Sequence, residues 1–195
     1  MRSFIKFSAT GVLLFVALTI NAQRIKTTEG DISVLKSETS INIEFTYNEM
    51  SVGKFEHESE YIEKKKSEYN AKEPGRGDSW AKNWISDRKM VFEPKFIDLF
   101  EKSTDMNVKA DAKYTIIFHT TTTEPGYNIY VTRKNAEIDA EVTIVETANR
   151  KKVIAVISVK NAPGRTFGGN DYATGDRIAE CYAVAGKKLG KFIKD

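Results

Sequence analysis

The sequence predicts an α+β domain with a largely antiparallel sheet of about five strands, helices inserted after the first strand and a long C-terminal helix. Three observations support this fold class. A segment of strict two-residue alternation near residue 41 precedes charged segments with helical spacing. Four strand-like segments joined by short connections then occupy residues 114–159. An amphipathic helical pattern fills residues 171–194.

The first predicted strand begins at Ile41. Ile41, Ile43, Phe45 and Tyr47 alternate with polar residues, and a period of two is typical of a strand with one buried face. Residues 57–72 instead carry apolar side chains at helical spacing within a highly charged segment. This pattern predicts a solvated helix with a narrow apolar stripe.

Two further helices are predicted before the run of strands. Residues 73–77 (Glu-Pro-Gly-Arg-Gly) break the first helix, and either Asp78 or Ser79 can cap the next one. Proline lacks an N–H and clashes with the preceding helical turn. Pro94 therefore fits the first turn of a third helix better than the interior of the second.

The second half of the chain contains predicted strands at residues 114–121, 127–133, 138–144 and 153–159. Their connections are short, and short connections favour an antiparallel meander. Six of the seven residues in 153–159 are apolar, so this strand is expected to be central and covered on both faces.

The last helix is expected from about Asp171 to Lys194. Its inward face is formed by Ile178, Cys181, Tyr182, Ala185, Leu189, Phe192 and Ile193. Cys181 is the single cysteine, so an internal disulfide is excluded. Its position on the apolar face predicts a buried small side chain rather than a reactive thiol.

The N-terminus has the layout of a secretory signal peptide. Arg2 and Lys6 precede an uncharged, mostly apolar stretch, and small Ala22 precedes Gln23 at the expected cleavage point. A membrane anchor and a first helix of the domain are the alternatives, but only seventeen uncharged residues separate Lys6 from Arg24, and a span needs about 20. A lipoprotein signal would need cysteine where Gln23 stands.

These features predict three segments: a signal peptide at 1–22, a flexible lead-in at 23–30 and a single α+β domain at 31–195. The product would be exported to the periplasm or beyond, without a stable membrane anchor after cleavage. Removing Arg2 and Lys6 from the 30 basic residues leaves 28 against 27 acidic residues, a net charge of about +1. This balance argues against nucleic acid as a partner, because such binders need many unopposed phosphate contacts.

Three groups of residues carry a family resemblance. They are the turn Thr123–Asn128, the segment Val145–Ala148 and the stretch Pro163–Lys187 with its Gly-rich loop. Together they resemble a group of uncharacterised exported proteins from Bacteroidetes, over roughly residues 40–193. This resemblance implies export but no activity. More distantly, the order of strands and the terminal helix resembles small periplasmic α/β domains of envelope-assembly factors, a likeness of fold only.

The main candidate site is the loop and helix start at residues 163–177. Glycines allow close backbone approach to a ligand, and the following helix N-terminus attracts anions. The candidate ligand-binding residues are Arg165, Gly168, Gly169, Asn170 and Asp171, with Arg165 as a bidentate partner for a carboxylate or phosphate. The alternative is a plain strand-to-helix connection capped by Asn170 or Asp171.

Other chemistry-bearing residues each have a structural alternative. His119 is either a general base beside an acid or a hydrogen-bonded histidine on a sheet. Glu137, Asp139 and Glu141 share one strand face, and could bind Ca²⁺ or pair with lysines such as Lys152 or Lys160 on a neighbouring strand.

Two short motifs in the helical region have structural alternatives as well. Trp80 and Trp84 lie one helical turn apart. They form either a ligand platform or part of the core. The lysine run at 64–66 lies between glutamates, and pairing along a helix explains it.

Three functional hypotheses follow. The first is an exported, non-catalytic envelope protein that binds another envelope component through its sheet edge or loops. The second is a binder of small anionic ligands that uses the 163–177 loop. The third is an exported hydrolase built around His119. No catalytic signature, cofactor or metal site is expected, and the oligomeric state is left open by the sequence.

Overall fold

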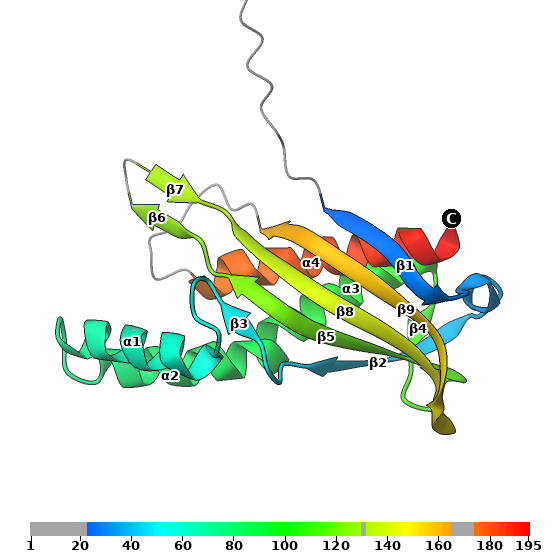
Figure 1. The fold of residues 1–195 in the computed structure, drawn as a ribbon, viewed down its shortest axis with the longest axis horizontal. Helices are drawn as coiled ribbons and strands as arrows, with labels where there is room; N and C mark the ends of the chain where they lie inside the picture. The colour runs from blue at the N-terminus through cyan, green and yellow to red at the C-terminus, as the bar shows by residue number, and fades with distance from the viewer. Residues whose placement is uncertain (1–22, 130–131, 165–173) are drawn as a thin grey trace, which may run out of the picture.

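The computed structural model describes residues 23–129, 132–164 and 174–195 (Figure 1). Its strands are β1 (Arg24–Gly30), β2 (Ser40–Thr46), β3 (Ser51–Val52), β4 (Asn107–Val108), β5 (Tyr114–Glu124), β6 (Tyr127–Ile129), β7 (Thr132–Lys134), β8 (Ala136–Glu146) and β9 (Asn149–Gly164). Its helices are α1 (Glu58–Asn70), α2 (Arg76–Asp87), α3 (Glu93–Thr104) and α4 (Thr174–Lys194), with a short 3-10 turn, η1 (Ser33–Leu35), and a π-helical segment, η2 (Arg88–Phe92).

The main sheet has seven strands in the order β1-β9-β8-β5-β2-β4, and β3 pairs with the end of β5. β5, β8, β9 and β1 form antiparallel neighbours, whereas β2 and β3 run parallel to β5, and β4 runs parallel to β2. Helices α3 and α4 lie together on one face of this sheet, and α1 and α2 form a hairpin that projects beyond its end (Figure 1). The α+β prediction is confirmed.

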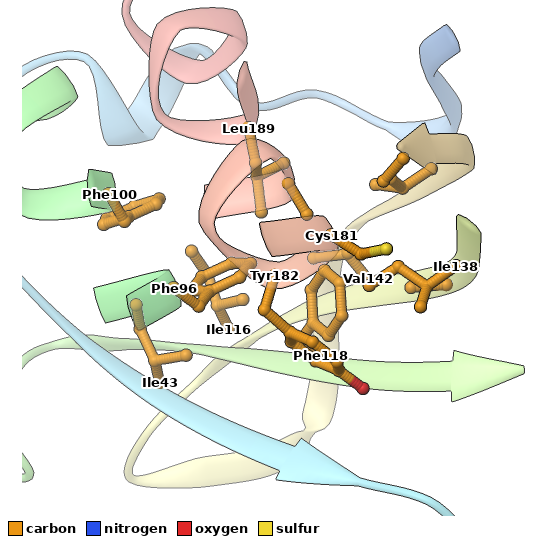
Figure 2. Close-up of a cluster of buried hydrophobic side chains, with 14 of the residues drawn as sticks. Ile43, Phe96, Phe100, Ile116, Phe118, Ile138, Val142, Cys181, Tyr182 and Leu189 are labelled. Atoms are coloured by element: carbon orange, nitrogen blue, oxygen red, sulfur yellow. The ribbon is translucent and has the colours of Figure 1, made fainter. Parts of the chain in front are cut away.

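The core lies between the sheet and the α3–α4 layer. Phe96 of α3, Phe118 of β5 and Tyr182 of α4 are all fully buried. The rings of Phe96 and Phe118 meet edge to face at 4.8 Å, and those of Phe118 and Tyr182 lie 5.9 Å apart (Figure 2). Aromatic groups in such contacts supply the largest apolar areas available to a core of this size.

Residues 24–30 correct the prediction of a flexible lead-in. They form β1, an edge strand paired with β9 from Arg24 opposite Lys160 to Gly30 opposite Ala155. The segment looks polar because an edge strand with one solvated face needs few apolar residues. Its Ile25 nevertheless packs against the core.

The strand predicted at 127–133 also needs correction. β5 pairs directly with β8, and β6 with β7 forms a separate two-stranded ribbon. The ribbon interrupts the hairpin between two long strands, so the local turn signal at Pro125-Gly126 was correct but the strand after it was assigned to the wrong sheet. β9 also differs from its prediction: Ala155, Ile157 and Val159 are buried under the helices, but Val153 is 51% exposed.

The proline at position 94 lies in the first turn of α3, as predicted. No loop separates α3 from α2, however, because η2 joins the two helices. A π-helical turn contains one more residue than an α-helical turn and can absorb a local change in hydrogen bonding. Residues 76–104 therefore form one continuous helical segment that η2 interrupts, and η2 sets the rotation of α3 relative to α2.

Close packing of α4 on α3 makes a stability test possible at Gly186. A Cβ at this position would lie 2.3 Å from the Phe96 carbonyl oxygen. Gly186→Ala is therefore expected to lower the free energy of unfolding by about 1–3 kcal/mol, as overpacking does, despite the better helix propensity of alanine. Urea denaturation measures the change. Lys187→Ala, at the exposed neighbouring position, is the control; equal midpoints for the two variants would contradict the packing.

Candidate functional site

A groove opens at the end of the sheet where β3, α1, the β5–β6 turn and α4 meet. Its volume is about 470 Å³, within the usual range for ligand sites. It is lined by Val52, Gly53, Lys54, Phe55, Tyr61, Lys64, Lys65, Glu124, Pro125, Gly126, Tyr127, Ile129 and Thr174. We call this the sheet-end groove. It brings together segments that are separated by more than a hundred residues in the chain.

One wall is a tight turn after β3. The N–H of Val52 donates to the Phe55 carbonyl and the N–H of Phe55 donates to the Val52 carbonyl, each at 3.0 Å. Gly53 adopts φ +58°, which favours glycine, and its N–H donates to the Thr123 carbonyl of β5 at 2.8 Å. The turn is thus fixed to the sheet, and it holds Lys54 and Phe55 at the rim.

A second wall, next to the first, is the turn at Pro125-Gly126. Glu124 accepts the Gly126 N–H at 3.0 Å and the Lys134 ammonium at 2.6 Å. Arg177 of α4, which is only 4% exposed, donates from Nε to the Pro125 carbonyl at 3.2 Å and from Nη2 to the Thr174 hydroxyl at 3.1 Å. A buried guanidinium therefore joins this wall to the first described turn of α4.

Lysine ammonium groups gather at the groove. Lys54 and Lys64 lie 5.6 and 5.7 Å from the centre of the Phe55 ring, distances at which a cation is attracted to an aromatic face. Lys64 and Lys65 share one carboxylate, Glu68, at 3.5 and 3.6 Å. Within the described residues Lys54 has no carboxylate within 4.0 Å.

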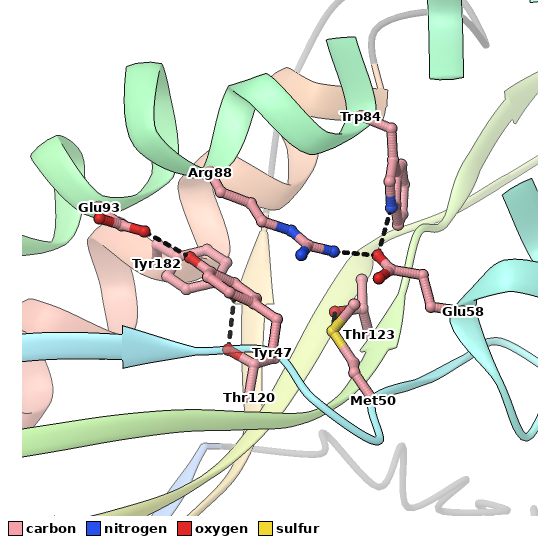
Figure 3. Close-up of polar contacts among 9 residues, drawn as sticks. All are labelled: Tyr47, Met50, Glu58, Trp84, Arg88, Glu93, Thr120, Thr123 and Tyr182. Atoms are coloured by element: carbon pink, nitrogen blue, oxygen red, sulfur yellow. Dashed lines mark hydrogen bonds and ion pairs between the residues drawn. The ribbon is translucent and has the colours of Figure 1, made fainter. Parts of the chain in front are cut away.

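A buried polar cluster lies beside the groove (Figure 3). Glu58 of α1 accepts the indole N–H of Trp84 at 2.5 Å and also binds the Arg88 guanidinium. Arg88 stacks over the Tyr47 ring at 4.3 Å, and Tyr47 donates to Glu93 at 3.3 Å. The cluster fastens the base of the α1–α2 hairpin to the core.

The two tyrosines near this cluster stay neutral. Burial raises the pKa of the Tyr47 phenol, and it also raises the pKa of Tyr182. The Tyr182 hydroxyl is hydrogen-bonded to Thr120 at 2.7 Å. The adjoining cavity of about 10 Å³ has room for about one water. These phenols are therefore poor candidates for a base, and the cluster is better suited to positioning α1 than to chemistry.

The predicted anion-site residues Arg165, Gly168, Gly169, Asn170 and Asp171 lie outside the described residues. Their prediction is therefore untested. The described end of that segment, from Thr174 onward, lies at the sheet-end groove.

His119 lies half-buried on the sheet face opposite the helices. Its Nδ1 is hydrogen-bonded to the Thr46 hydroxyl at 2.9 Å. Glu141 is its cross-strand neighbour on β8, yet within the described residues no carboxylate oxygen lies within 4.0 Å of the ring nitrogens. This arrangement favours the hydrogen-bonded structural histidine over the general base.

Of the three acidic residues on one face of β8, Asp139 is engaged in cross-strand pairing. Asp139 accepts the Lys160 ammonium at 3.0 Å and the Asn161 N–H at 2.8 Å, whereas Lys152 pairs with Glu146 instead. Burial raises the pKa of Glu137. Among the residues that the structure describes, no group of three or more acidic, histidine or cysteine side chains could hold a metal ion.

The Trp pair and the cysteine are packing residues. Trp84 is 6% exposed, and Trp80 contacts Tyr61 and Tyr69 edge to face within the α1–α2 hairpin. Cys181 is buried, and this burial raises its pKa well above the ordinary value, so the thiol stays protonated.

The sequence did not reveal the sheet-end groove. Lys64 and Lys65 pair along their helix as predicted and also face the groove, whereas Lys66 pairs with Asp78 of α2. A usable signal was present in the exposed apolar residues Tyr127 and Ile129, at 40% and 51% exposure, which follow the Pro-Gly turn. Only the fold brings them opposite Phe55.

Comparison with known proteins gives limited information. No family model matches the chain, and no curated protein matches it. Among solved structures, the PelC dodecamer from Paraburkholderia phytofirmans is 11% identical, with a TM-score of 0.38, over 84% of this chain and 96% of that one. A single-substitution variant of the same PelC gives the same identity and TM-score over 97% of its length. The likeness is one of fold only, and the resemblance to exported Bacteroidetes proteins stays a prediction.

Over the described ranges 23–129, 132–164 and 174–195, none of the helices has the length and apolar character needed to cross a bilayer.

The polar cluster provides a test of how the α1–α2 hairpin is held. The side chains of Arg88 and Glu58 are only 16% and 18% exposed, so Glu58→Ala leaves a largely desolvated guanidinium and the Trp84 N–H without their acceptor. Because unmade buried hydrogen bonds are costly, we expect a loss of about 1–3 kcal/mol in the free energy of unfolding. Chemical denaturation followed by tryptophan fluorescence measures it. Glu60→Ala, exposed on the same helix, should change stability by less than about 0.5 kcal/mol; equal losses would refute the assignment.

Proposed function

We propose that this protein is an exported, non-catalytic envelope protein that binds another envelope component, and that an anionic group of that component is held in the sheet-end groove. The observation that supports it is the convergence of Lys54, Lys64 and Lys65 on one groove with aromatic walls. Neither the helical pattern of α1 nor the turn after β3 requires three lysines at this groove.

The charge balance of the groove favours an anion. Among the described residues of its lining the single carboxylate is Glu124, and the Lys134 ammonium neutralises it. Glu68 offsets one of the two positive charges on Lys64 and Lys65. The remaining positive charge attracts anions and strengthens their hydrogen bonds to ammonium groups. Thr174 adds the N-terminal end of α4, where the helix dipole also favours negative charge.

The apolar lining indicates that more than a bare ion is recognised. Phe55, Tyr127 and Ile129 flank the lysines, and the last two are exposed large side chains of a ribbon outside the main sheet. Exposed apolar groups beside a cationic rim are typical of contact surfaces. The bound component would therefore combine a carboxylate or phosphate with an apolar or ring-shaped part.

Two alternatives carry less support. A hydrolase around His119 would need an acid and a substrate pocket at that ring, whereas the His119 Nδ1 is paired with Thr46 and the sheet-end groove is lined by other residues. A site confined to the 163–177 loop stays a proposal. It is compatible with the groove, because the described start of α4 forms part of the same lining.

Neutralising the groove lysines tests this function. Lys54, Lys64 and Lys65 are changed together to glutamine, and binding of inorganic phosphate, poly-L-glutamate and polygalacturonate is measured by calorimetry at low and high salt. We expect at least one anionic probe to bind the unaltered chain, to bind less tightly at high salt because screening weakens charge pairing, and to lose about tenfold in affinity in the variant, or about 1.4 kcal/mol.

The matched control changes Lys187, Lys188 and Lys191 to glutamine. These lysines are exposed on α4, and their loss alters the net charge equally without touching the groove. Equal loss of binding in the two triple variants would show that only net charge matters. Absence of binding for every anionic probe, or unchanged affinity in the groove variant, would refute the proposed site.

A further inference from the structure

A second hollow lies on the sheet face that α3 and α4 leave uncovered. Its volume is about 240 Å³, and its lining consists of Thr28, Thr121, Ala140, Glu141, Ser158 and Lys160. These residues come from four neighbouring strands, β1, β5, β8 and β9. They share no residue with the sheet-end groove, so the two sites can be tested separately.

Strand irregularities converge on this hollow. The pairing of β1 with β9 shifts between Thr27 and Glu29, which leaves Thr28 without a cross-strand partner. The pairing of β5 with β8 shifts between Thr120 and Thr122, which leaves Thr121 in the same position. Bulges redirect side chains and are common beside functional sites. Both threonines line the hollow, where the Thr28 hydroxyl donates to the Val156 carbonyl at 3.1 Å.

A third irregularity lies between these two. β8 and β9 lose register between Ile138 and Ala140, where Asn161 adopts φ +55°. Asp139 stabilises this bulge by accepting the Asn161 N–H, and it also pairs with Lys160. Three adjacent strand pairs are thus interrupted, two of them next to Asp139 and the third beside Val156 and Ile157 of β9. A regular sheet has no such register shifts, because each shift loses hydrogen bonds between the paired strands.

The polar groups of the hollow are incompletely paired. The hydroxyl oxygen of Thr121 is buried and has no hydrogen-bond partner. Across the described chain, neither the Glu141 carboxylate nor the Ser158 hydroxyl makes a side-chain hydrogen bond or an ion pair. Of these three groups only the Thr121 hydroxyl is buried, since Glu141 is exposed and Ser158 is half-buried. A buried polar group without a partner is uncommon in folded proteins and calls for a bound water, ion or ligand.

We propose that this hollow binds a neutral polyhydroxylated ligand of about one ring, a monosaccharide or a cyclitol. Ligand hydroxyls both donate and accept, which suits a lining of hydroxyls, one carboxylate and one ammonium. Asp139 already balances the charge of Lys160, which leaves the exposed Glu141 carboxylate as the one unpaired charge among the described residues of the lining, so the site disfavours an anionic ligand. The volume fits a single ring rather than a longer chain.

Removing one hydroxyl tests the proposal. Thr121→Val keeps the side-chain shape, and it is expected to weaken binding of D-glucose, D-galactose or myo-inositol about tenfold, as measured by ligand-observed NMR and calorimetry on the purified chain. The same change should leave the melting temperature unchanged or raise it, since it removes an unsatisfied buried hydroxyl. Weaker binding with an unchanged melting temperature would show that the Thr121 hydroxyl contacts the ligand, because a purely structural role would change stability instead.

Two further variants complete the experiment. Thr143→Val, on β8 and outside the hollow, should bind the probes like the unaltered chain. The triple lysine variant of the sheet-end groove should also bind them normally. If none of the three probes shows saturable binding, the hollow holds ordered water only and the proposal is overturned. Equal affinities for the Thr121→Val and Thr143→Val variants would also overturn it.

Discussion

Tyr182 connects the helix layer to the sheet, and its contacts determine how α4 packs on the sheet. Its ring stacks on Phe92 at 5.2 Å and contacts Phe118 of the sheet. Its hydroxyl is hydrogen-bonded to Thr120 of β5. A fully buried tyrosine is favourable only when its hydroxyl has a partner, so α4 can settle on the sheet in few ways. That contact fixes the rotation of α4 and brings its first described residue to the sheet-end groove.

One-sided covering of the sheet determines where recognition can occur. Because α3 and α4 occupy one face, a ligand must use the open face, an edge or an end of the sheet. The sheet-end groove lies at one end, and the bulged hollow lies on the open face. The two differ in chemistry: lysines and aromatic rings form the first, and hydroxyls the second.

Particular residues show how far sequence reasoning reached. The alternation at 41–47, the inward face of 178–193 and the position of Pro94 were interpreted correctly, because each depends on local periodicity or local backbone sterics. Residues 24–30 and 127–133 were misassigned for the same reason: an edge strand and a detached ribbon differ from a lead-in and a sheet strand only in their partners. The apolar run at 153–159 predicted cover on both faces, although its outer face has half-buried and exposed residues.

By itself the sequence determined the α+β class, the helices after the first predicted strand and the C-terminal helix, the burial of Cys181 and Trp84, and the pairing of Lys64 and Lys65 with an acidic neighbour on their helix. Each is a property of residues close together in the chain. Only the tertiary structure decided that Lys54 and Lys64 meet over Phe55, that Tyr127 lines the same groove, and that bulges in β1 and β5 bring Thr28 and Thr121 into one hollow. Strand register and the docking of α4 create these neighbours, and both arise from contacts between residues far apart in the chain, where periodicity carries no information.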